Sequence, residues 1–247
     1  MSEVRKIDLN ADVGEGLNNE QDLFPFISSC SIACGGHAGD EQTMKRVVAL
    51  ALENKVKIGA HPSYPDRENF GRKSIKLARP DLISCVREQI ESLLQILEEA
   101  NAPLHHIKPH GALYNDLAKD KELARCFMEA VRPYRNSTKL YVPYGSVIAE
   151  EAKASGWPVF YEAFGDRNYN DDLSLVSRSN PEALIQDPHS VLQHILPIIR
   201  EGKLTTLTGE KKAIKAETIC LHGDTDNVLE ILTYLAREFP KNNLLIA

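Results

Sequence analysis

The clearest pattern in the chain is an alternation of apolar and polar residues near its start, in Ile7–Gly16. Its apolar members are Ile7, Leu9, Ala11 and Val13, and its polar members are Asp8, Asn10 and Asp12. A period of two predicts a strand with unlike faces. On an antiparallel sheet the polar face would meet water. Because later apolar segments also end in His, Lys or Asp and lead into helical patterns, we expect this strand to be buried on both sides, with its carboxylates facing a site.

The rest of the chain repeats this order of apolar segment, turn and helical pattern. The further predicted strands are Ser31–Cys34, Val56–Ala60, Ile107–Gly111, Lys139–Val142, Pro158–Ala163 and Glu217–Leu221. The predicted helices are a short one within Asn18–Ser29, one capped by Asp40, and then Pro80–Asn101, Asp116–Val131, Ser146–Ser155, Pro181–Glu201 and Thr225–Glu238. Leu204–Leu207 and Ala213–Ala216 flank a Gly-Glu turn and predict a hairpin. About seven strands that alternate with helices predict a parallel sheet.

The chain has 247 residues, of which 43% are hydrophobic and 26% are charged. Because α/β barrels commonly use about 200–250 residues as one domain, and no linker or repeat divides the chain, we expect a single domain over residues 1–247. With a net charge of −6, the chain lacks the excess of basic residues that nucleic-acid-binding proteins use, so we do not expect it to bind nucleic acid. Its apolar runs are too short to span a membrane. Five cysteines without a CxxC pair, and a polar start without a signal core, predict a cytoplasmic protein with reduced thiols.

Polar residues end several of the predicted strands and should meet at one mouth, where barrel active sites lie. His61 follows one strand, and Lys108 and His110 share one face of another. A lysine on a buried strand face should pair with a carboxylate, for which Asp8 or Asp12 is available. Because it stands at the end of its strand, we expect Lys108 near the wet mouth. Each histidine is equally a ligand or a packed imidazole.

Other polar residues near the predicted strand ends are candidates for holding a substrate. They are Asn10, His37, Arg72, Tyr114, Glu162, Arg167, His222 and Asp224. The arginines fall in predicted loops and could hold a carboxylate by two hydrogen bonds, while Asp224 could also cap the last helix. Helix N-termini aimed at the mouth favour an anionic ligand. The sequence contains no P-loop, dinucleotide fingerprint, nucleophile elbow or HExxH motif.

Long stretches of the chain resemble the family of 5-oxoprolinase A subunits. The stretches that carry the resemblance are Asp8–Gly16, Ile32–Asp40, Ile58–Asp66, Lys108–Asn115, Glu162–Arg167 and His222–Thr225. They keep the family's order over Val4–Ala247. Gly36 stands where the family usually has an aromatic residue and Lys73 where it has a second arginine, but the polar set is intact.

The resemblance implies a cytoplasmic subunit that acts with other 5-oxoprolinase subunits and uses ATP to open 5-oxo-L-proline to L-glutamate. It also implies a (β/α) barrel-like fold related in shape to polysaccharide deacetylases. Since the chain has no P-loop, we expect its partner subunits to bind the ATP. A homo-oligomer remains open.

For the chemistry we expect a general base, an oxyanion partner and an anchor for the substrate carboxylate. His61 or His110, held by Asp8 or Asp12, would be the base that activates water. Lys108 would stabilise negative charge on the carbonyl oxygen. The anchor would be Arg72 or Arg167.

Two other functions stay open from the sequence. In the first, Asp12, His37, His61 and His110 bind a divalent metal, and the chain alone hydrolyses an acetamide, by analogy with deacetylases of the same fold. In the second, the barrel only binds the lactam and presents it to a partner.

Overall fold

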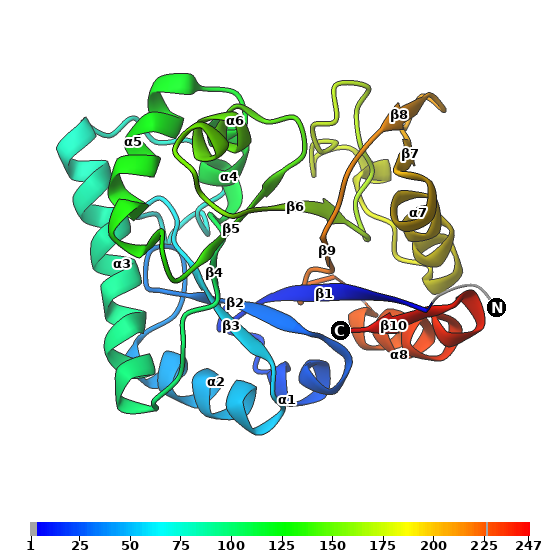
Figure 1. Ribbon diagram of the computed structural model, residues 1–247, viewed down its shortest axis with the longest axis horizontal. Helices are drawn as coiled ribbons and strands as arrows, with labels where there is room; N and C mark the ends of the chain where they lie inside the picture. The colour runs from blue at the N-terminus through cyan, green and yellow to red at the C-terminus, as the bar shows by residue number, and fades with distance from the viewer. Residues whose placement is uncertain (1–3, 226) are drawn as a thin grey trace.

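The computed structural model describes residues 4–225 and 227–247. In these residues seven parallel strands close a barrel, because β1 pairs with β2 on one side and with β9 on the other (Figure 1). In order around the barrel they are β1 (Arg5–Val13), β2 (Ser29–Ala33), β3 (Lys57–His61), β4 (His106–Ile107), β5 (Lys139–Pro143), β6 (Val159–Phe164) and β9 (Thr218–Cys220). The predicted parallel strands and barrel-like α/β architecture are confirmed.

The polar face of β1 points into the barrel. Asn10 donates from Nδ2 to Thr218 Oγ1 on β9 at 2.7 Å and to Glu162 Oε1 on β6 at 2.9 Å. Asp8 accepts a hydrogen bond from Ser29 Oγ on β2 at 2.6 Å. Asp8 and Asn10 are 7% and 0% exposed. The prediction that this strand is buried on both sides is therefore confirmed, and the other strands supply the partners that its buried polar groups need.

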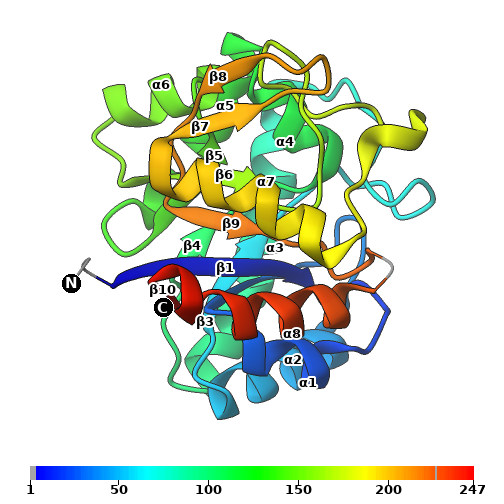
Figure 2. The same ribbon diagram turned by 90° about the vertical axis from the view of Figure 1, so that its right-hand side faces the viewer.

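Helices cover the outside of the barrel (Figures 1 and 2). They are α1 (Glu20–Leu23), α2 (Glu41–Glu53), α3 (Arg79–Glu99), α4 (Gly111–Leu117), α5 (Lys121–Val131), α6 (Val147–Ala154), α7 (Pro188–Glu201) and α8 (Val228–Glu238). The longer helices each bury an apolar face, as α3 does with Val86, Ile90 and Leu93. Together with the outward apolar residues of the strands, these faces form the core. No helix within the described ranges is both long and apolar enough to cross a membrane.

Several predicted boundaries differ from the structure. The strand predicted over Ile107–Gly111 ends at Ile107, and Gly111–Leu117 form a helix, α4, that the pattern did not predict. The helix predicted over Asp116–Val131 is α5 and begins only at Lys121, where the Asp120 side chain accepts a hydrogen bond from Leu123 N at 3.0 Å. The segment predicted as the helix Pro181–Glu201 begins with a single 3-10 turn, and α7 starts only at Pro188.

The end of the chain also differs from the prediction. The helix predicted over Thr225–Glu238 starts at Val228 as α8; one residue of that prediction, position 226, lies outside the described residues. The predicted hairpin is present as β7 (Lys203–Thr205) and β8 (Lys211–Ala213), which pair antiparallel. A short strand that the pattern did not predict, β10 (Leu244–Ile246), pairs in parallel with the start of β1.

Candidate active site

The carboxyl ends of the barrel strands surround a pocket of about 310 Å³. The predicted site residues that line it are Asp12, His61, Arg72, Lys108, His110, Tyr114, Arg167, His222 and Asp224. Parallel strands bring their carboxyl ends to the same edge, which is why residues from distant parts of the chain meet here. The volume lies near the lower end of the roughly 300–1,000 Å³ range of ligand sites, so it suits a small molecule.

Lys108 is buried, with 1% of its surface exposed, and lies between two carboxylates. Its Nζ is 3.0 Å from Asp12 Oδ1 and 2.8 Å from Glu162 Oε1. It also donates to Asn10 Oδ1 at 3.2 Å. Because an unpaired ammonium in the interior is very costly, these partners are what allow Lys108 to be there. The predicted pairing with Asp8 or Asp12 is confirmed, with Asp12 as the partner. Lys108 lines the pocket as expected, but it is buried, so the expected exposure to water at the mouth is wrong.

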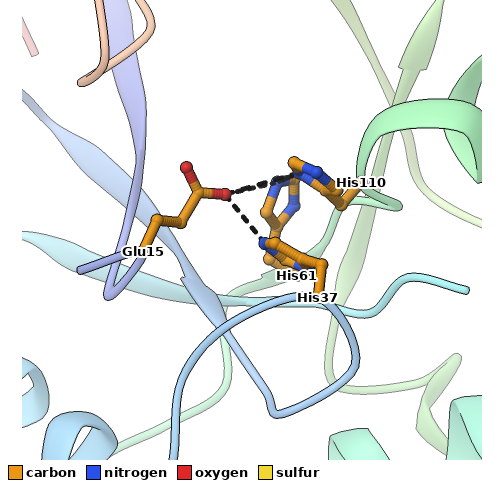
Figure 3. Close-up of side chains that lie close together, drawn as sticks. All are labelled: Glu15, His37, His61 and His110. Atoms are coloured by element: carbon orange, nitrogen blue, oxygen red, sulfur yellow. Dashed lines mark hydrogen bonds and ion pairs between the residues drawn. The ribbon is translucent and has the colours of Figure 1, made fainter. Parts of the chain in front are cut away.

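Beside this ion-paired lysine, the carboxylate of Glu15 faces three imidazoles (Figure 3). Its Oε1 lies 2.8 Å from His37 Nε2, 3.4 Å from His110 Nδ1 and 3.9 Å from His61 Nε2. His61 Nε2 and His110 Nδ1 are 2.9 Å apart, and the rings of His37 and His110 stack at 3.6 Å. Asp12 Oδ2 also approaches His61 Nε2, at 3.3 Å. We call Glu15, His37, His61 and His110 the Glu15–histidine cluster.

Backbone carbonyls orient His61, the last residue of β3, and His110, the residue before α4. His61 Nδ1 donates to Lys108 O at 2.7 Å, and His110 Nε2 donates to Phe70 O at 3.0 Å. Since a carbonyl oxygen can only accept, these nitrogens carry protons, and the other nitrogen of each ring, His61 Nε2 or His110 Nδ1, faces Glu15. The loop carrying Phe70 can come this close because Gly71, at φ +61°, has no Cβ; one placed there would lie 2.9 Å from His110 Cδ2.

The electrostatics of the pocket follow from burial and from these contacts. Burial lowers the pKa of His37 to about 2, and burial with the neighbouring imidazoles also holds the pKa of His110 well below its usual value. Burial would raise the pKa of Asp12, but His61 and Lys108 outweigh it and hold this pKa well below its usual range. Burial would lower the pKa of Lys108, but Asp12, Cys220 and Glu162 raise it. At neutral pH the site therefore holds a charged Lys108 near the neutral imidazoles of His37 and His110.

His222 is oriented by a carboxylate that the sequence did not point to. Asp166 Oδ1 lies 2.9 Å from His222 Nδ1, and its Oδ2 accepts from His222 N at 2.9 Å and from Thr225 Oγ1 at 2.6 Å. The ring of His222 stacks on Phe164, with centroids 5.2 Å apart. Burial would raise the pKa of Asp166, but His222 and these hydrogen bonds lower it. His222 is thus held in one orientation at the pocket wall.

The arginines of the site differ in whether their side chains are available to bind a ligand. Arg72 lies at the pocket rim, where its Nη2 is 2.6 Å from Asp224 Oδ2. Arg178, which also lines the pocket, approaches the other oxygen of Asp224 at 3.7 Å. Arg167 is buried and donates to Val176 O at 2.7 Å and to Ala183 O at 3.3 Å, so it holds the loop after β6. This favours Arg72 over Arg167 as the anchor for a carboxylate.

Four predicted site residues do not line the pocket. Asn10 and Glu162 lie below it as partners of Lys108, and His37 lies behind His110. Asp8 is elsewhere: it bonds Thr218 Oγ1 at 2.8 Å and approaches Lys57 Nζ at 3.6 Å, at the amino-terminal end of the barrel. The structure does not bring Asp8 to the site, and its predicted role as a holder of the base passes to Asp12.

Glu15, Asp166 and Phe164 complete the site but were not among the candidates. Glu15 follows Gly14, whose φ of +74° turns the chain back over the barrel at the end of β1. Asp166 comes shortly after the end of β6, at the same kind of position as several of the predicted candidates. This position after an apolar segment is the sequence signal by which Asp166 could have been predicted. Nothing in the sequence pattern singles out Phe164 from the other buried aromatic residues.

Comparison with known proteins gives the family. The LamB/YcsF family matches residues 7–247. The 5-oxoprolinase A subunit of Haemophilus influenzae (strain PittGG) is 42% identical over 246 residues, which are 98% of this chain and 99% of that protein. The crystal structure of a lactam utilization protein from Thermus thermophilus is 35% identical and has a TM-score of 0.91, over 98% of both chains.

A family 4 carbohydrate esterase from Streptomyces lividans also matches, with 10% identity and a TM-score of 0.47, over 100% of this chain and 93% of that one. We draw no functional conclusion from this distant likeness. The family match over nearly the whole chain and the similar relatives confirm the resemblance expected from the sequence motifs. The chain belongs to the LamB/YcsF family.

Proposed function

We propose that the chain is a subunit of an ATP-dependent 5-oxoprolinase, a cytoplasmic enzyme that opens the lactam of 5-oxo-L-proline to give L-glutamate. The observation that carries the proposal is the placement of the Lys108 ammonium and the His61–His110 pair on either side of Asp12, in one small pocket. Relatives named as A subunits of 5-oxoprolinase, which the chain matches over almost its whole length, support it.

Lactam opening needs an activated carbonyl and an activated water, since a five-membered lactam is a stable amide. Water would add its oxygen to the carbonyl carbon, the carbon–nitrogen bond would break, and the ring nitrogen would take up a proton. We assign activation of the water to the His61–His110 pair, with Asp12 positioning His61. Lys108, charged and already held in place, would stabilise the negative charge that develops on the carbonyl oxygen.

The substrate carboxylate would be held at the rim of the pocket by Arg72. This arginine is fixed by Asp224 yet keeps 44% of its side chain exposed, so it can add a bond to a ligand. Partner subunits would bind ATP and supply the activation of the amide, because the sequence contains no P-loop.

The test is reconstitution. The purified chain is mixed with candidate partner subunits, 5-oxo-L-proline and ATP, and L-glutamate and ADP are measured. We expect glutamate only when chain, partners and ATP are all present. Fast turnover by the isolated chain would contradict the need for partners, and metal-dependent release of acetate from acetylated amines would favour a deacetylase instead.

A second experiment separates a catalytic subunit from one that only binds the lactam. In reconstituted enzyme, His110→Asn should lower single-turnover glutamate formation by about 10²–10⁴-fold at saturating lactam if the histidine pair activates water. A variant whose loss is fully restored by more lactam would show a binding role alone. His189→Asn, an exposed histidine on α7, is the matched control and should behave as the unmodified chain.

A further inference from the structure

The Glu15–histidine cluster brings two imidazole nitrogens into direct contact. His61 Nε2 and His110 Nδ1 face each other at 2.9 Å. The opposite nitrogen of each ring already donates its proton to a backbone carbonyl, Lys108 O or Phe70 O. The two facing nitrogens cannot both present a lone pair at this distance without repulsion, so a cation must lie against both of them, either a shared proton or a bound metal ion.

The spacing of the donor atoms fits a metal ion. His61 Nε2, His110 Nδ1 and Glu15 Oε1 form a triangle with sides of 2.9, 3.4 and 3.9 Å. Ligands bound tetrahedrally at about 2.0–2.1 Å are about 3.3 Å apart, near the middle of these values. Three ligands from the protein, with a fourth position left open, is the arrangement of catalytic zinc sites.

The surroundings of the three atoms are those that metal ligands usually have. Each ligating histidine donates its other nitrogen to a carbonyl, which fixes its tautomer. The Glu15 carboxylate is in turn held by His37, whose Nε2 lies 2.8 Å from Oε1. His37 Nδ1 has no hydrogen-bond partner within the described part of the chain, so the proton of this neutral ring belongs on Nε2, where it can be donated to Glu15. His37 is therefore a positioning residue, stacked on His110.

We propose that Glu15, His61 and His110 bind one divalent transition-metal ion, with Zn²⁺ as the best match to two imidazoles and a carboxylate. Figure 3 shows the carboxylate and the rings turned toward one another around this position. Asp12 is left outside the ligand set because its carboxylate is paired with Lys108. The inference concerns binding by the isolated chain and does not rest on lactam opening; with an ion bound, the ion would supply the activation of water in the pocket.

The experiment uses the full chain without a polyhistidine tag, stripped of metal by a chelator and titrated with Zn²⁺ or Co²⁺. We expect one ion per chain by elemental analysis, visible absorption bands from bound Co²⁺ that Zn²⁺ abolishes, and a rise in melting temperature on adding Zn²⁺. Glu15→Gln and His110→Asn should each weaken binding at least about 100-fold, and His37→Phe by roughly 10–100-fold.

His189→Asn is the control and should bind as the unmodified chain does. Circular dichroism of each variant without metal separates lost binding from lost folding. Binding that survives in His110→Asn, or no binding to the folded chain, would overturn the inference. Neither ATP nor a partner is present, so failure here leaves the proposed lactam opening standing, and failure of glutamate formation leaves the metal site standing.

Discussion

Lys108 Nζ lies 2.8 Å from Glu162 Oε1, and both side chains are buried inside the barrel. The other face of the same ammonium meets Asp12 at 3.0 Å. One cation thus balances two carboxylates that come from β1 and β6, two strands of the barrel that are separated by β9 alone. Removing it would leave both carboxylates buried without their cation.

We predict that Lys108→Met lowers the free energy of unfolding by about 3–5 kcal/mol, the usual cost of breaking a buried ion pair from one side. Denaturant unfolding followed by circular dichroism measures it. Lys57→Met is the matched control: Lys57 also pairs with a barrel aspartate, Asp8 at 3.6 Å, but its side chain is 44% exposed, so the change should be at most about 1 kcal/mol. Equal stability of Lys108→Met and the unmodified chain would contradict this account.

The contacts of Asp166 predict how stability depends on pH. Its pKa is lowered in the folded chain, so its contribution to stability is fully present above the unfolded value of about 3.9 and is lost as pH falls through the folded value. Asp166→Asn should therefore be less stable at pH 7, by at least about 1.5–3 kcal/mol. Below about pH 4 its stability should fall less steeply with pH than that of the unmodified chain.

Unfolding curves recorded from pH 2 to pH 7 check this prediction. Asp22→Asn, on an exposed position of α1, is the control and should change stability by no more than about 0.5 kcal/mol. Parallel stability curves for Asp166→Asn and the unmodified chain would show that Asp166 is not charged in the folded state.

The junction between α4 and α5 gives a third prediction. Asp120 caps α5 through Leu123 N, so Asp120→Ala should cost about 0.5–2 kcal/mol of stability, while Asp120→Asn should be nearly neutral because asparagine caps helices as well. Thermal unfolding of both variants is the measurement. If alanine and asparagine have the same effect, the side-chain cap does not stabilise this helix start.

The strand pattern predicts which residues face the barrel interior but not how deep they lie. Asp8 and Asp12 share a face by the period of two, and the structure confirms that both point inward. At about 3.3 Å per residue, however, four residues along a strand separate them by about 13 Å. Asp12 therefore reaches the pocket and Asp8 the opposite end of the barrel. Judging depth requires the register between strands, which depends on tertiary pairing.

The same limit explains why the cluster could be predicted only in part. His61 is the last residue of β3, and its position at a strand end is readable from the sequence. His110 was expected on a strand face but lies beyond β4, as the residue before α4. Glu15 lies beyond a glycine turn with no periodic pattern, and it reaches the histidines only because the chain folds back at Gly14. The sequence pattern also does not predict the break before α5. Ala118–Asp120 contains neither glycine nor proline, and the only sign of a new helix there is the capping residue Asp120.

The last prediction concerns Arg72 and rests on the proposed function. If this arginine holds the carboxylate of 5-oxo-L-proline, Arg72→Gln in reconstituted enzyme should lower kcat/KM by roughly 10–100-fold, the range expected for a lost hydrogen bond to a charged group. Most of the loss should appear in KM, because the bond is made equally in the ground and transition states. The decisive comparison is 2-pyrrolidinone, the same ring without a carboxyl group, whose kcat/KM should be nearly unchanged. Arg125→Gln, at the exposed surface of α5 beside Glu122, should leave both substrates unaffected. An equal loss on the two lactams would show that Arg72 shapes the pocket through Asp224 without touching the substrate carboxylate.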